Sequence, residues 1–112
     1  MDYKPTLFGL LHQGVFGITR EQHAALKGVP LSELDENMTV DELRFHNKAM
    51  VLCNDLHMER NSYGIRAIAD DVMDAARQIR AEIVEYERTT GKTVTTAEIP
   101  FHYPIEHKEA TQ

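Results

Sequence analysis

The chain has 112 residues, the length of one domain that can bury a single modest core. It carries 12 Lys and Arg against 18 Asp and Glu, a net charge of -6, which disfavours sequence-blind binding to nucleic acid and favours a protein partner. A single cysteine, Cys53, excludes an intramolecular disulfide and fits a reducing compartment. The apolar stretch that begins at Thr6 stops at His12, too short for an export signal or a membrane span. We therefore expect a soluble cytoplasmic protein.

The first predicted element is a short amphipathic helix. Glycine inside a helix costs up to about 1 kcal/mol relative to alanine. We therefore expect this helix to end near Gln13 and a glycine turn to follow through residues 14–17. Its apolar residues are Leu7, Phe8, Leu11 and Val15.

Two capping boxes mark the next helices, one starting at Thr19 and the other at Thr39. In this motif the threonine hydroxyl caps the helix, while a Gln or Glu three residues later reaches back to the threonine amide. They predict a helix over residues 20–27, ended by Gly28, and a long helix over residues 40–59.

The longest predicted helix covers residues 65–88, and the rest of the chain is organised around it. Its apolar residues recur at three- and four-residue steps, which makes one stripe on a helix. The stripe contains Ile65, Ile68, Val72, Ala75, Ile79, Ile83 and Tyr86, and the preceding helix has a matching face of Phe45, Ala49, Leu52 and Leu56. The short connection between the two helices predicts an antiparallel hairpin, with Gly91 as its stop.

The sequence after Gly91 does not continue the helical pattern of the preceding segments. Residues 94–99 favour an extended segment, Phe101–Tyr103 form an arm between two prolines, and residues 105–112 form a polar tail. The predicted fold is all-α: one small helical domain over residues 1–112, with its core at about 6–100. It is built on the antiparallel hairpin, with short N-terminal helices and an extended C-terminal arm.

One edge of the predicted helix 40–59 carries ligand types for a soft metal: His46, Met50, Cys53 and His57. At 1.5 Å per residue, the two histidines lie about 16 Å apart along the axis and cannot share an ion. Only Cys53 and His57 could contribute together, so a metal-dependent helical enzyme is one alternative and a core edge is the other. No metal or other cofactor is predicted.

The charged side of the helix over residues 65–88 is the candidate for partner binding. It carries Asp70, Asp71, Asp74, Arg77 and Arg80. The alternative is a solvated face with the intrahelical pairs Asp74–Arg77 and Glu85–Arg88. The six histidines are scattered along the sequence, and no serine or cysteine has the spacing of a nucleophile with its base. We therefore expect no catalytic residue and no enzymatic activity.

Several short segments occur in a fixed order between Leu7 and Pro100. They are Gln13-Gly14 with Gly17, Lys27-Gly28, Asn37-Met38 before the helix start at Thr39–Leu43, Arg77-Gln78-Ile79-Arg80, Thr90-Gly91-Lys92, and Ala97-Glu98-Ile99-Pro100. This ordered set resembles the C-terminal region of the DNA-damage-inducible protein D family and of related phage antirepressor-like proteins. The family's N-terminal region, which holds a DNA-binding domain in the antirepressor-like relatives, has no counterpart in these 112 residues, so the resemblance does not imply direct DNA binding.

The resemblance implies a non-enzymatic regulator of the bacterial damage (SOS) response or of a phage. The expected partner is a RecA-type recombinase or its filament on single-stranded DNA, and an acidic helical surface could compete with DNA for it. The alternatives are a phage-encoded inhibitor of a host defence or DNA-processing enzyme, the metal-dependent enzyme, and an oligomerisation module. A homodimer through the apolar stripes of the two long helices is a further expectation.

Overall fold

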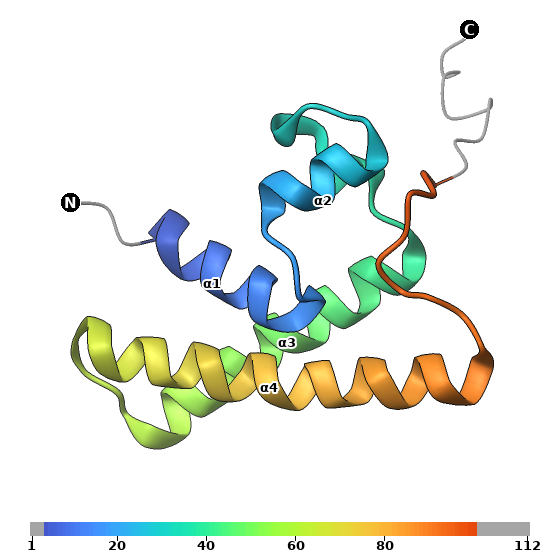
Figure 1. Ribbon diagram of the computed structural model, residues 1–112. Helices are drawn as coiled ribbons and strands as arrows, with labels where there is room; N and C mark the ends of the chain where they lie inside the picture. The colour runs from blue at the N-terminus through green and yellow to red at the C-terminus, as the bar shows by residue number, and fades with distance from the viewer. Residues whose placement is uncertain (1–3, 101–112) are drawn as a thin grey trace, which may run out of the picture.

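The computed structural model describes the backbone of residues 4–100 and the side chains of residues 7–100. Its helices are α1 (Lys4–Phe16), α2 (Arg20–Lys27), α3 (Val40–Arg60) and α4 (Gly64–Thr90), with short 3-10 turns at Leu31–Glu33 and Asp35–Asn37. The predicted all-α fold is confirmed: α3 and α4 form the antiparallel hairpin, and α1 lies across them (Figure 1). No helix within this part is long and apolar enough to cross a membrane.

Capping residues in the sequence determine where α2 and α3 begin and where α2 and α4 end. Both capping boxes are formed, since the Thr19 hydroxyl accepts from the Gln22 amide at 3.0 Å and the Thr39 hydroxyl from the Glu42 amide at 3.2 Å. Gly28 and Gly91 adopt the left-handed conformation that ends α2 and α4, where glycine pays no steric penalty.

The predicted end of α1 is wrong, because the helix continues through Gly14 to Phe16. A Cβ atom placed on Gly14 would lie 2.6 Å from the Cβ atom of Ala76 in α4. The absence of a side chain at Gly14 therefore lets α1 and α4 approach closely, and this contact outweighs the low helix propensity of glycine. The left-handed residue that ends the helix is Gly17, with a φ of 81°.

The core lies where α1, α3 and α4 meet. The apolar stripes predicted for the two long helices face inward, and Ile65 at the start of α4 is the exception, with 40% exposure. Because the stripes pack within the chain, a dimer through them would require the core to open. The buried residues include Leu11, Val15, Phe16, Phe45, Ala49, Val72, Ala75, Ala76, Ile79 and Ile83.

Residues 92–100, called the strap below, run without helix or strand from the end of α4 past the start of α3 toward α2 (Figure 1). Side chains of the helices hold the strap through its backbone. The Val94 amide donates to the Glu87 carboxylate (2.8 Å), and Lys27 Nζ donates to the Glu98 carbonyl. The predicted arm at Phe101–Tyr103 and the polar tail lie outside the described residues.

Candidate functional site

The residues predicted to bind a partner on α4 fall into different environments. Asp70 and Arg77 are exposed, whereas Asp71 has 1% exposure and accepts a hydrogen bond from Arg60 Nη1 at 3.0 Å. The interpretation of this face as fully solvated is therefore wrong for Asp71. Asp74 accepts from Arg60 at 2.9 Å and from Arg77 at 3.0 Å.

The predicted intrahelical pairs Asp74–Arg77 and Glu85–Arg88 are both formed. Arg80 points toward α1: its Nη1 donates to the Val15 carbonyl at 3.3 Å. A cation near the C-terminus of a helix stabilises the carbonyls that lack intrahelical donors. Arg80 thus has a structural contact, and partner binding by this set of residues stays a prediction.

Sequence reasoning missed a buried polar chain that connects α1, α2 and α3. His12 Nε2 and His23 Nδ1 share a hydrogen bond of 2.9 Å, and His23 Nε2 donates to Glu42 Oε2 at 2.7 Å. Lys27 Nζ lies 2.9 Å from Glu42 Oε1. Glu42 also accepts from the backbone amides of Thr39 (2.7 Å) and Thr96 (3.2 Å), so donors from α2, the start of α3 and the strap meet at its carboxylate.

Burial and hydrogen bonding determine the protonation states of side chains in this buried polar chain. Burial alone would raise the pKa of Glu42, but the hydrogen bonds from His23, Lys27 and two backbone amides outweigh it and lower the pKa to about 2. Burial, with the positive charges nearby, lowers the pKa of His12 to about 3. Glu42 is therefore ionised and His12 neutral near pH 7.

The arrangement of a glutamate and two histidines has the order of a proton relay, but it is sealed. His12, His23 and Glu42 each have 0% exposure, so a substrate cannot reach them without rearrangement of the helices. When His23 is neutral, its Nδ1 accepts from His12 Nε2, and His12 Nδ1 is then buried without a partner. One feature of the sequence could have indicated the buried polar chain: His23 and Lys27 lie four residues apart on the buried face of α2.

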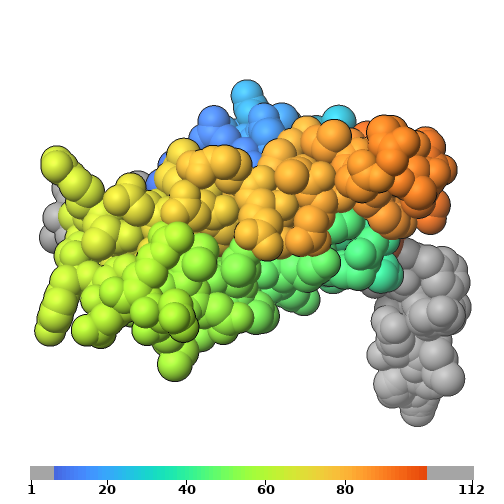
Figure 2. Space-filling view, turned by 90° about the horizontal axis from the view of Figure 1, so that it is seen from below, coloured from blue at the N-terminus to red at the C-terminus, as the bar shows by residue number. Residues whose placement is uncertain are grey.

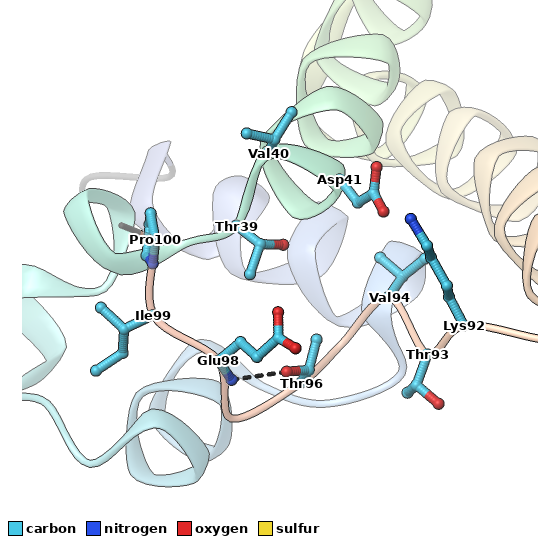
Figure 3. Close-up of a pocket in the computed structure, with 10 residues that line it drawn as sticks. All are labelled: Thr39, Val40, Asp41, Lys92, Thr93, Val94, Thr96, Glu98, Ile99 and Pro100. Carbon is cyan, nitrogen blue, oxygen red and sulfur yellow. Dashed lines mark hydrogen bonds between the residues drawn. The ribbon is translucent and has the colours of Figure 1, made fainter. Parts of the chain in front are cut away.

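A pocket of about 880 Å³ lies between the strap and the start of α3 (Figure 3). Its charged side chains are Asp41, Lys92 and Glu98, and Figure 3 shows Asp41 and Lys92 together on one side and Ile99 with Pro100 on the other. Asp41 is already hydrogen-bonded to Tyr86 Oη at 2.9 Å. Because both signs of charge are present, the pocket favours neither an anion nor a cation.

A second hollow is an apolar groove of about 440 Å³ bounded by α1, α3 and α4. None of its nine lining residues carries a formal charge when histidine is neutral, although 27% of the chain is charged. The lining residues are Leu7, Phe8, Leu11, Met50, Cys53, Asn54, His57, Ile68 and Val72. The groove was not predicted, because its walls come from three separate parts of the sequence.

The groove contains Cys53 and His57, the pair considered for a metal. Burial, followed by the charge of Asp71, raises the pKa of the Cys53 thiol, which disfavours the thiolate that binds metals or attacks substrates. His57 Nδ1 lies 3.8 Å from Asp71 Oδ2, beyond hydrogen-bond distance. Within the described residues, no three His, Cys, Asp or Glu side chains gather to hold a metal ion.

The outer side of α3 carries further exposed apolar residues. Val51 and Met58 are 61% and 70% exposed, and Met50 on the groove wall is 37% exposed. We call the groove together with Val51 and Met58 the docking surface. Figure 2 shows α3, in green, running beside α4 across an open face of the molecule.

Comparison with known proteins found no matching family model, no similar curated protein and no similar solved structure.

Proposed function

We propose that the chain is a non-enzymatic protein-binding module that acts through the docking surface. The observation that carries the proposal is the uncharged groove between three helices, with exposed Val51 and Met58 beside it. Contiguous exposed apolar surface on a protein is a mark of interaction sites, and depletion of charge with enrichment in methionine is typical of interface centres.

The placement of two groups that could take part in catalysis supports a binding role. The histidine–glutamate chain is inaccessible to solvent, and the pKa of the Cys53 thiol is raised. Both observations fit groups that stabilise the fold. They leave the docking surface as the accessible feature with the composition of a functional site.

The first target to test is a RecA-type recombinase filament on single-stranded DNA, because the resemblance of the ordered sequence segments points to it. A labelled single strand would be titrated with the chain, alone and then coated with recombinase and ATP, and its anisotropy followed. We expect a change only with the coated strand. A change with the bare strand, or with neither, would contradict the proposed target.

A matched pair of variants connects this binding to the docking surface. Val51→Glu places a charge on the surface, whereas Val84→Glu places the same charge at a position on α4 that is 50% exposed and outside the groove. We expect the first variant to lose binding and the second to keep it, with the circular dichroism of both unchanged. Equal binding by both variants would exclude the docking surface.

A further inference from the structure

The outer side of α3 carries a second periodic pattern, distinct from the stripe that packs into the core. Its residues are exposed and follow one another at steps of four, three and four. This alternation is the spacing of a coiled-coil seam, and polar asparagine in such a seam favours one register at a cost in stability. The residues are Asn47, Val51, Asn54 and Met58, and we call them the outer seam.

The charge distribution favours a second copy of the chain on this seam. Each copy carries a net charge of -6, so two copies repel each other over most of their surfaces. The outer seam and the adjoining groove carry no formal charge when His57 is neutral. Two copies that meet there bring no like charges into the centre of the contact.

The charges that flank the seam indicate the orientation. Lys48 and Asp55 lie seven residues apart on the same side of α3, and both are exposed. In a parallel contact in register, each would face the opposite flank of the partner's seam, so the two charges would not meet. In an antiparallel contact, a two-fold axis beside Val51 places Lys48 of one copy against Asp55 of the other, twice.

We propose that the docking surface is occupied by a second copy of this chain, in an antiparallel two-fold contact of α3 against α3. The inference rests on the proposed function and names a second copy as the protein that the docking surface binds. The filament would then be bound by the dimer, and Val51→Glu would lower that binding by weakening the dimer. The contact differs from a dimer through the core stripes, since it uses side chains that the folded chain leaves exposed. The charged face around Asp70 and Arg77 would stay open to a target.

Sedimentation velocity of the full chain from about 1 to about 500 µM, the range in which weak interfaces dissociate, tests the contact. We expect a reversible dimer that becomes tighter with added salt, because salt screens the repulsion between two acidic copies. Val51→Glu places two carboxylates at the axis and should weaken the dimer about tenfold or more. Val84→Glu should leave it unchanged.

A charge exchange tests the orientation. Lys48→Asp should weaken the dimer, and the double variant Lys48→Asp with Asp55→Lys should restore it, because the cross-pairs re-form with reversed signs. Lys48 also contacts Glu82 within the chain at 2.6 Å, so circular dichroism of each variant serves as the control for folding. Failure of the double variant to restore the dimer would overturn the antiparallel arrangement.

The outcome is separable from that of the proposed function. A monomer at every concentration, or a dimer that Val51→Glu leaves intact, would overturn the second copy as occupant. If such a monomer still bound the recombinase filament through Val51, the docking surface would belong to that target and the proposed function would stand. A dimer without any effect on the filament would support the contact and overturn the recombinase as target.

Discussion

Lys27 and Glu42 form an ion pair inside the molecule, with Nζ 2.9 Å from Oε1 and both side chains inaccessible to solvent. Two buried charges recover their cost of desolvation only when their geometry is good and the remaining polar atoms are satisfied. Here the second oxygen of Glu42 accepts from His23 and from the Thr96 amide. The pair therefore connects α2, α3 and the strap.

Removal of the lysine charge should destabilise the fold. Lys27→Met leaves the Glu42 carboxylate buried without its cation, and breaking such a pair costs about 3 kcal/mol or more. The exposed pair Lys48–Glu82 supplies the control, since Lys48→Met should cost less than about 1 kcal/mol. Urea unfolding of the two variants measures both values, and equal costs would contradict the role assigned to Lys27.

Two glycines of α1 should respond to alanine with opposite signs. At Gly14 a Cβ atom would lie 2.6 Å from that of Ala76, whereas at Gly9 it would meet nothing within 4 Å. Gly9→Ala should therefore raise the free energy of unfolding by up to about 1 kcal/mol through helix propensity. Gly14→Ala should lower it by about 1–3 kcal/mol through overpacking. Thermal unfolding of both variants is the measurement, and stabilisation by Gly14→Ala would mean that α1 and α4 are not in close contact.

These two glycines show where sequence reasoning was sufficient and where it was not. The bounds of α2 were predicted because Thr19 and Gly28 act within a few residues of the helix ends. The end of α1 was not, because the contact that keeps Gly14 helical is made with Ala76, far away in the sequence. Helix propensity alone predicts the same cost for glycine at Gly9 and at Gly14.

The same reason explains the candidate site. Cys53 and His57 were recognised as neighbours on one edge of α3, since their spacing is local. The walls that make this edge a groove come from Phe8 in α1 and Ile68 in α4, and their approach depends on the packed core. The pairing of His12 with His23 likewise requires α1 and α2 to be in place.

Stability should fall as the pH is lowered through the ordinary range of histidine. The pKa of His12 is 6.5 in an unperturbed state and about 3 in the folded chain, so below about pH 6.5 the unfolded state binds a proton that the folded state does not. The free energy of unfolding should then drop by about 2 kcal/mol between about pH 8 and about pH 5 from this residue alone. The lowered pKa of His46 acts in the same direction.

Glu42 makes stability fall with pH in the same direction, but in a separate and more acidic window. Its pKa is lowered from 4.5 to about 2, so the stability that it contributes is complete above about pH 4.5 and is lost only below that value.

The variant His12→Gln tests the contribution of His12, because glutamine keeps a donor for His23 and cannot titrate. Its unfolding free energy should vary less between pH 5 and 8 than that of the wild type, and an identical pH dependence would show that His12 does not cause the loss.

Asp70 and Asp71 are neighbours in the sequence but should behave differently when changed. Asp71→Asn removes the charge from a carboxylate with 1% exposure that accepts from Arg60, and we expect a loss of about 2 kcal/mol in unfolding free energy. Asp70 is exposed, so Asp70→Lys should change stability by less than about 0.5 kcal/mol. A binding assay on Asp70→Lys therefore tests the α4 face without altering the fold. Loss of filament binding in this variant would show that the target contacts α4, whereas full binding would restrict partner recognition to other surfaces of the chain. Asp71→Asn does not make that distinction, because it also changes the buried contact with Arg60 that connects α4 to α3.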